Sequence, residues 1–83
     1  MSDAATVVRR VIPDEPPKLR KDVYFAACRA KGATTEKDRV RLFGMPRRSV
    51  FRYENDEVVP LLSTAQWIAS QLDCTVDELW PAA

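Results

Sequence analysis

Histidine, cysteine and glycine are scarce in this chain, and their scarcity excludes several kinds of functional site. The 83 residues include no histidine, two cysteines and two glycines. With no histidine and no Cys-x-x-Cys pair, the sequence does not predict a zinc site. It also lacks a recognisable nucleophile–base motif and a glycine-rich phosphate loop. We therefore expect neither an enzyme nor a cofactor nor a small-molecule substrate.

Long apolar segments are missing as well. The chain has no run of 18 apolar residues, so the sequence predicts no transmembrane helix and no membrane partner. Its first residues do not follow the basic-then-apolar order of a secretory signal, which favours a cytoplasmic protein. In that compartment Cys28 and Cys74 are expected to be ordinary buried thiols. A Cys28–Cys74 disulfide and a reactive thiol are the alternatives.

The net charge of +1 conceals a strong segregation of charge along the chain. Residues 18–54 carry eleven basic and four acidic side chains, a net of +7. Residues 55–83 carry five acidic and no basic side chains, a net of −5. A basic segment of this kind favours a polyanionic partner. The alternative is a mixed surface over which the charges scatter.

The distribution of proline divides the chain into an arm, residues 1–17, and one helical domain, residues 18–83. Pro13, Pro16 and Pro17 surround two acidic residues, a composition typical of linkers. Within the arm, residues 6–12 have strong β propensity. They can pair as a short strand or stay mobile until a partner binds.

Residues 18–83 carry helical patterns throughout, so we expect a compact all-α domain with five short helices. Gly32 is placed to end the first helix, and Thr34 or Thr35 to cap the second. Thr75 and Glu78 form the pattern of a capping box before a one-turn helix. The predicted helices span about residues 19–30, 35–43, 46–55, 61–72 and 76–79.

Apolar residues at helical spacing predict the buried faces of the first and fourth helices. Trp67 is expected in the core, whereas Trp80 is left open between core packing and a contact between chains. The predicted apolar positions are Leu19, Val23, Ala26, Ala27 and Ala30 in the first helix, and Leu61, Leu62, Ala65, Ile68, Ala69 and Leu72 in the fourth.

The third predicted helix separates two kinds of side chain around its axis. At about 100° per residue, Val50 and Tyr53 lie together on one side, where a core would take them. The opposite side would carry three arginines, an aromatic ring and an amide, namely Arg47, Arg48, Phe51, Arg52 and Asn55. An exposed phenylalanine lowers solubility, so contact with a partner explains this face better than solvation does.

Arginine and phenylalanine together suit the edges of DNA bases. The guanidinium group pairs with guanine O6 and N7 or with phosphate, and an apolar ring packs on the methyl group of thymine. The alternative is a solvated basic face in which Phe51 folds against the neighbouring helix.

The order of these elements resembles that of a known family. Tyr53-Glu54-Asn55 closes the third helix, Ile68-Ala69-Ser70-Gln71-Leu72 closes the fourth, and Thr75-Val76-Asp77-Glu78-Leu79 forms the final turn. Over about residues 20–80 this pattern resembles the phage repressor/Cro (XRE-type) helix-turn-helix family. The resemblance implies a five-helix domain of the lambda-repressor-like type, with the third helix as the recognition helix.

The resemblance also implies a function. A member of this family would be a sequence-specific regulator of transcription that binds double-stranded DNA, of the phage or prophage repressor or Cro-like kind, and it would associate with the nucleoid. Residues expected to contact bases or phosphates are Arg47, Arg48, Ser49, Phe51, Arg52 and Asn55 in the third helix and Lys37 and Arg41 in the second. Further candidates for phosphate contacts are Lys18, Arg20, Lys21 and the Arg9–Arg10 pair.

In several members of the family, an arginine of the first helix pairs with the glutamate that closes the third helix. Arg29 and Glu54 stand at matching positions, so the resemblance implies a structural ion pair between them. The alternative is a free surface Arg29. Asp56 and Asp73 occupy positions where the family usually has glycine, and aspartate tolerates the left-handed backbone better than most residues.

Other positions depart from the family pattern. Thr35 and Glu36 occupy the start of the second helix, where the family often has a glutamine that contacts phosphate, and Glu36 would repel a phosphate instead. Arg39 and Val40 replace the usual Leu-Ala pair inside the same helix.

The sequence leaves open the oligomeric state and the choice between two functions. The family usually binds a palindromic operator as a homodimer, and the alternative is a monomer that binds DNA with help from its arm. Candidate dimer contacts are Trp80, the Val58–Val59 loop and the apolar part of the arm. The alternative function is that of a protein-interaction module on the same fold, an antitoxin or antirepressor that binds a protein through the arm or the acidic C-terminal third.

Overall fold

The computed structural model describes residues 17–81, and in this part of the chain it contains five α-helices and no β-strand. The helices are α2 (Lys21–Ala30), α3 (Glu36–Phe43), α4 (Arg47–Glu54), α5 (Leu62–Gln71) and α6 (Val76–Leu79). The predictions of an all-α class and of five helices are confirmed for these residues. The predicted arm, with Arg9 and Arg10, lies outside the described residues except for Pro17.

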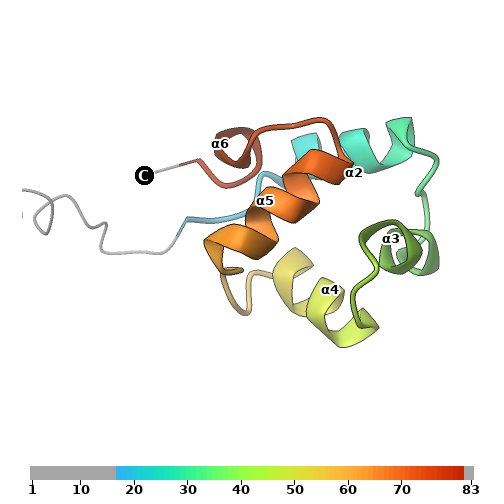
Figure 1. Cartoon of the computed structure of the whole chain (residues 1–83), viewed down its shortest axis with the longest axis horizontal. Helices are drawn as coiled ribbons and strands as arrows, with labels where there is room; N and C mark the ends of the chain where they lie inside the picture. The colour runs from blue at the N-terminus through green and yellow to red at the C-terminus, as the bar shows by residue number, and fades with distance from the viewer. Residues whose placement is uncertain (1–16, 82–83) are drawn as a thin grey trace, which may run out of the picture.

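The helices pack around one small core. In Figure 1, α5 runs diagonally across the middle of the domain, α4 forms the lower edge, and α3 lies beside it. Helix α3 contacts α4 and α5, while α6 contacts α2 and α5. Each helix contributes one of the largest fully buried side chains: Cys28, Phe43, Val50, Ile68 and Leu79. Burial of these apolar groups is therefore shared by all five helices, and none of them can pack alone.

Two helices begin with capping boxes. The Thr35 side chain accepts a hydrogen bond from the Asp38 backbone nitrogen at 3.1 Å, and the Asp38 carboxylate accepts one from the Thr35 nitrogen at 3.2 Å. Thr75 and Glu78 make the same reciprocal pair at the start of α6. The capping box predicted for Thr75 is thus confirmed, and Thr35 rather than Thr34 caps α3.

Two aspartates adopt the left-handed backbone conformation that was expected where the family has glycine. Asp56 has φ 58° and Asp73 has φ 56°. The Asp56 carboxylate accepts a hydrogen bond from the Leu19 nitrogen at 3.1 Å, and the Asp73 carboxylate pairs with Lys31. A side chain that ties two segments together offsets the cost of a left-handed conformation. Aspartate therefore makes contacts here that glycine could not.

Part of the predicted apolar pattern is wrong. Ala26 and Ala30 are exposed, and α2 instead buries Tyr24 and Cys28, which lie one helical turn apart. At the start of α5, Leu61 is 75% exposed and Leu62 65% exposed. Leu61 only caps α5 and Leu62 opens it, so both project beyond the core. The remaining predicted positions of α5, from Ala65 to Leu72, are buried as expected.

The two tryptophans differ in burial. Trp67 is about half exposed, so its assignment to the core is wrong. Trp67 lies about 150° around the helix from the middle of the side that carries the buried Ala65, Ile68 and Ala69. Its indole Nε1 donates a hydrogen bond of 2.8 Å to the Phe43 carbonyl, so the ring covers the end of α3. Trp80 is buried, which removes it from the candidate contacts between chains.

The cysteines are free thiols, as predicted, with Cys28 buried and Cys74 half-buried. Burial raises the pKa of the Cys28 thiol to about 11, so it stays protonated at neutral pH. Among the helices of residues 17–81, none has the length and apolar content needed to cross a membrane.

Candidate nucleic-acid interface

Helices α3 and α4 are joined by a turn of only three residues, Gly44–Pro46. Gly44 ends α3 with φ 65°, a left-handed conformation that favours glycine. Its nitrogen donates a hydrogen bond of 2.9 Å to the Val40 carbonyl. Pro46 caps α4 in an extended conformation, one residue earlier than the first helical position predicted for it. The turn therefore joins two eight-residue helices through a short link whose glycine and proline have defined backbone conformations.

The inner side of α4 fastens this helix to the core. Val50 is fully buried and Tyr53 is half-buried, as the helical periodicity predicts. The outer side is exposed at every predicted position, and we call it the basic face of α4: Arg47, Arg48, Phe51, Arg52 and Asn55.

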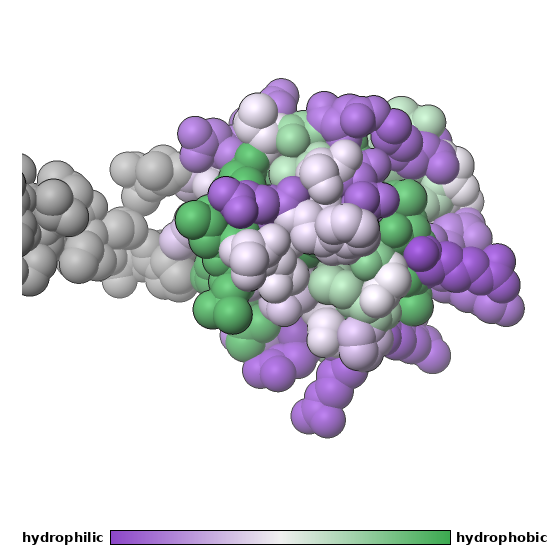
Figure 2. Space-filling view, viewed as in Figure 1, coloured by the Kyte–Doolittle hydropathy of each residue, from purple (hydrophilic) through white to green (hydrophobic). Residues whose placement is uncertain are grey.

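Phe51 lies on the basic face with 47% of its surface exposed, so the alternative in which it folds against a neighbouring helix is wrong. Figure 2 shows hydrophilic side chains projecting from the lower edge of the domain, where α4 lies, and from the side next to α3. Lys37 and Arg41 of α3 are exposed as well.

Two predicted contact residues are less available than the others. Ser49 lies on the flank of α4 and is only partly exposed. The Asn55 amide nitrogen donates a hydrogen bond of 2.7 Å to the Phe51 carbonyl, which stabilises the end of the helix. Contacts by Asn55 would therefore involve its amide oxygen.

Glu54 closes α4 from inside the domain, and its buried carboxylate accepts three hydrogen bonds from two residues. The Arg39 guanidinium donates two hydrogen bonds to it, from Nε at 2.6 Å and from Nη2 at 3.1 Å. The Tyr24 hydroxyl donates a third at 2.5 Å. Arg39 also lies over the ring of Phe25, with 4.9 Å between the guanidinium carbon and the ring centroid. A buried carboxylate needs such complete pairing, and here the pairing fixes α4 to α3 and α2.

The predicted ion pair between Arg29 and Glu54 is wrong. Arg29 is exposed in the last turn of α2, about 100° around the helix from the buried Cys28. The cation comes from Arg39 of α3 instead, and α2 contributes the neutral Tyr24 hydroxyl. One signal could have revealed this: an arginine at a position where the family has an apolar residue needs a buried anion.

The electrostatics of this cluster favour a charged arginine and a neutral tyrosine. Burial, and then the hydrogen bond to Glu54, raise the pKa of Tyr24 far above its ordinary value. Burial lowers the pKa of Arg39, but the hydrogen bond and charge of Glu54 outweigh this, so the pKa lies above its ordinary value. The arrangement therefore keeps its hydrogen bonds throughout the neutral pH range.

A second ion pair joins the first turns of α3 and α4. Arg47 Nε donates to Glu36 Oε1 at 2.7 Å, and the Arg47 side chain stays 80% exposed. Beside this pair lies an open hollow of about 370 Å³, lined by Glu36, Lys37, Val40 and Arg47. Arg47 therefore belongs both to the lining of this hollow and to the basic face of α4.

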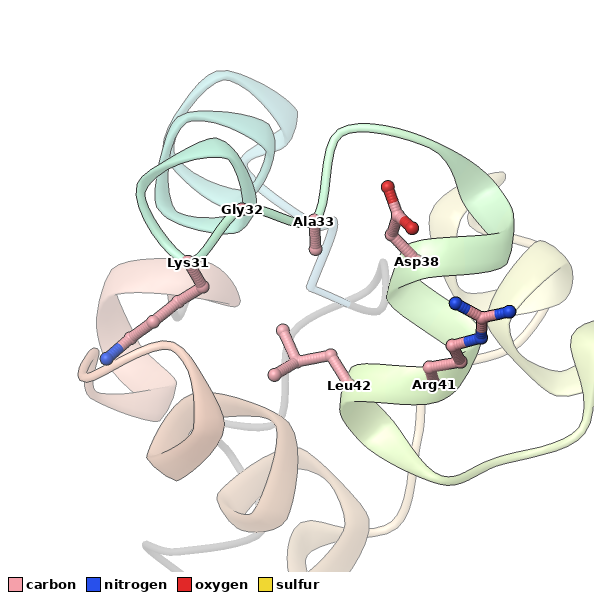
Figure 3. A pocket seen from close by; sticks show the side chains of 6 residues that line it. All are labelled: Lys31, Gly32, Ala33, Asp38, Arg41 and Leu42. Atoms are coloured by element: carbon pink, nitrogen blue, oxygen red, sulfur yellow. The ribbon is translucent and has the colours of Figure 1, made fainter.

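Another open hollow, of about 280 Å³, lies between the end of α2 and α3. Figure 3 shows Leu42 pointing into this space and Lys31 pointing away from α3. Lys31 pairs with Asp73, and Asp38 belongs to the capping box of α3. The charges around this hollow are therefore engaged in holding the fold, and it offers a ligand little beyond the exposed Arg41.

No group of three or more histidine, cysteine, aspartate or glutamate side chains gathers within residues 17–81 in a way that could hold a metal ion. In the same range, each buried side-chain nitrogen or oxygen has a hydrogen-bond partner. Comparison of the chain with protein-family models, curated proteins and solved structures gave no match.

Proposed function

We propose that the protein is a sequence-specific regulator of transcription that binds double-stranded DNA, of the repressor or Cro-like type. In this proposal α3, the Gly44–Pro46 turn and α4 act as a helix-turn-helix unit of the lambda-repressor-like kind. Helix α4 enters the major groove, which is wide enough for an α-helix. The observation that carries the proposal is the basic face of α4, where three arginines surround an exposed phenylalanine on a helix fixed from behind.

The attachment of α4 to the core supports base recognition rather than general attraction to a polyanion. A helix that reads bases must present its side chains at fixed positions, and the buried Glu54 cluster and Val50 hold α4 from its inner side. Loose attraction to phosphate would need the positive charge alone.

The contacts divide into two classes by their position. Arg47, Arg48, Phe51 and Arg52 lie on the outer side of α4 and would reach base edges or the phosphates that flank the groove. Lys37 and Arg41 lie on α3 and would contact the DNA backbone. Phe51 would pack on a thymine methyl group.

Selection of binding sites from random duplexes, with the full chain, tests the proposal directly. We expect a defined motif, with palindromy if a dimer binds. If four to six phosphates are neutralised, the logarithm of the affinity should fall with the logarithm of salt concentration at a slope of roughly −4 to −5. Failure to select a motif, together with an affinity independent of salt, would contradict the proposal.

A protein-interaction role on the same fold, as in an antitoxin or antirepressor, is the second candidate, and exposed apolar residues favour it. Val59, Leu61 and Leu62 are exposed large hydrophobic residues, and we call them the apolar patch. Figure 2 shows hydrophobic surface on the side of the domain where α5 begins. The patch belongs to residues 55–83, which carry a net charge of −5. Exposed apolar residues next to one another mark contact surfaces, including those between two copies of one chain.

The two candidates predict different outcomes for a double substitution in the apolar patch. Leu61→Ser with Leu62→Ser should leave the fold intact because both side chains are already exposed. Light scattering of the purified chain would show whether self-association depends on the patch. If the double variant binds the selected DNA as tightly as the original chain, the patch serves another protein or no partner at all. If its affinity falls together with its mass, the patch serves a DNA-binding dimer.

A further inference from the structure

The exposed ion pair between Glu36 and Arg47 joins the first turn of α3 to the basic face of α4. We propose that the hollow beside this pair is a subsite for the edge of a guanine base, read by Arg47 while Glu36 holds its side chain in position. This inference rests on the proposed DNA-binding function, and it adds the base that is read and the residue that positions the reader.

The hydrogen bond to Glu36 uses only one of the donor groups of Arg47. Glu36 takes the Nε hydrogen at 2.7 Å, so the two terminal nitrogens are left at the outer end of the side chain. Guanine presents two acceptors, O6 and N7, which match two parallel N–H donors. An arginine held at Nε therefore offers the pair of donors that end-on recognition of guanine requires.

The two partners of this ion pair differ in exposure. The Arg47 side chain is 80% exposed and the Glu36 side chain 30%, so Glu36 is the more firmly placed partner. An arginine that is held before binding loses less conformational freedom on binding than a free one. Glu36 thus acts as a positioning residue, and Arg47 makes the contact.

The negative charge on Glu36 affects which part of DNA Arg47 contacts. A carboxylate beside the hollow repels phosphate and directs the Arg47 fork away from the DNA backbone, toward the base edges. Val40 lines the same hollow and gives it an apolar side. Arg48, the next residue on α4, is exposed, and within residues 17–81 no ion pair holds it. It is the matched control for an arginine that is not held.

The experiment uses the full chain and the DNA motif recovered by selection. Affinities are measured for every single-base variant of the motif, and for a duplex in which 7-deazaguanine removes the N7 acceptor at one guanine at a time. We expect one guanine at which Arg47→Ala reduces discrimination by roughly 5- to 150-fold, the range for a bidentate contact. The 7-deaza substitution at that guanine should weaken the original chain and leave Arg47→Ala unaffected.

The Glu36 variants then separate positioning from simple repulsion. Glu36→Ala should lose discrimination at the same guanine, bind random DNA more tightly, and steepen the salt slope by about one. Glu36→Gln keeps an acceptor for Arg47 Nε and should retain the discrimination. Arg48→Ala should weaken binding to the motif as a whole and leave the discrimination at that guanine unchanged.

Two results would overturn the inference, and they can be told apart. If Glu36→Ala changes affinity equally for all sequences, Glu36 does not position a base-reading arginine, although the DNA-binding function stands. If the original chain selects no motif, the proposed function fails and the inference fails with it. Circular dichroism of each variant confirms that the fold is retained.

Discussion

Two ion pairs join α3 to α4. Both consist of an arginine and a glutamate, but they differ in burial. The pair between Arg39 and Glu54 lies at the base of the unit, with side chains only 11% and 9% exposed. The pair between Arg47 and Glu36 lies at the tip, with side chains 80% and 30% exposed. The first belongs to the packing of the fold, whereas the second stays free to meet a partner.

Burial decides what each pair contributes. A buried pair has already lost its hydration, so removing one partner leaves an uncompensated charge in the interior. An exposed pair gains little because water and salt compete with it. A surface arginine that contributes little to stability can be used for binding at little cost to the fold.

The largest expected effect comes from breaking the buried pair. Glu54→Ala should lower the free energy of unfolding by about 3–5 kcal/mol because it leaves the Arg39 guanidinium buried without its partner. Chemical denaturation monitored by circular dichroism measures this loss. Arg29→Ala, which changes an exposed arginine, is the control and should cost less than about 0.5 kcal/mol.

A double variant tests whether the loss in Glu54→Ala comes from the unpaired charge of Arg39. Arg39→Met with Glu54→Leu removes both charges and should recover part of the stability lost by Glu54→Ala, because apolar residues of similar size replace a desolvated pair. The recovery is partial because the buried Tyr24 hydroxyl still lacks its acceptor. If the double variant is no more stable than Glu54→Ala, the cost lies in lost packing rather than in the orphaned charge.

The next largest effect concerns DNA binding and leaves stability unchanged. Arg48→Ala should weaken binding to the selected motif by about 1–3 kcal/mol if Arg48 reads a base, since it lies on the basic face of α4. Arg29→Ala removes the same charge from another exposed position and is the matched control. Equal losses for the two variants would mean that net charge, not the basic face, attracts DNA.

The inner and outer sides of α4 could be predicted from the sequence because they depend only on helical periodicity. Val50 and Tyr53 point inward and the arginines outward in any eight-residue helix at this position. The capping box of Thr75 and Glu78 was predictable for a similar reason, since its partners are three residues apart.

The partner of Glu54 could not be predicted in the same way. Arg39 and Glu54 are 15 residues apart in sequence. They come into contact only when α3 and α4 pack against each other in the folded domain. The exposure of Leu61, Leu62 and Trp67 has a related cause, because the core is too small to cover every apolar residue on α5. The partner of Glu54 and the exposure of these apolar side chains depend on tertiary packing, which the local sequence pattern does not predict.

Alkaline pH gives a smaller effect, again confined to the buried cluster. The pKa of Tyr24 is higher in the folded than in the unfolded chain, so the unfolded chain loses its proton first, near pH 10. The stability that depends on the neutral hydroxyl is complete below that pH and is lost as the pH rises above it. The Cys28 thiol, with its pKa raised to about 11, acts in the same direction.

Tyr24→Phe isolates the contribution of the hydroxyl. At neutral pH the variant should lose about 1 kcal/mol, because Glu54 keeps both hydrogen bonds from Arg39. Its stability should then fall less steeply above pH 10 than that of the original chain. Urea titrations at pH 7, 9, 10 and 11 measure both quantities, and parallel pH profiles for the two proteins would refute the assignment.

The smallest effect should come from the exposed pair. A double-mutant cycle with Glu36→Ala, Arg47→Ala and the combined variant should give a coupling energy below about 1 kcal/mol in the free energy of unfolding. Salt at 1 M, where charges are screened within about 3 Å, should reduce this coupling further. The Arg39–Glu54 cycle, measured in the same buffers, should keep most of its coupling because its charges lie away from solvent. Coupling of equal size and equal salt resistance in the two cycles would make Glu36 a structural residue, and the exposed pair could no longer be assigned to recognition.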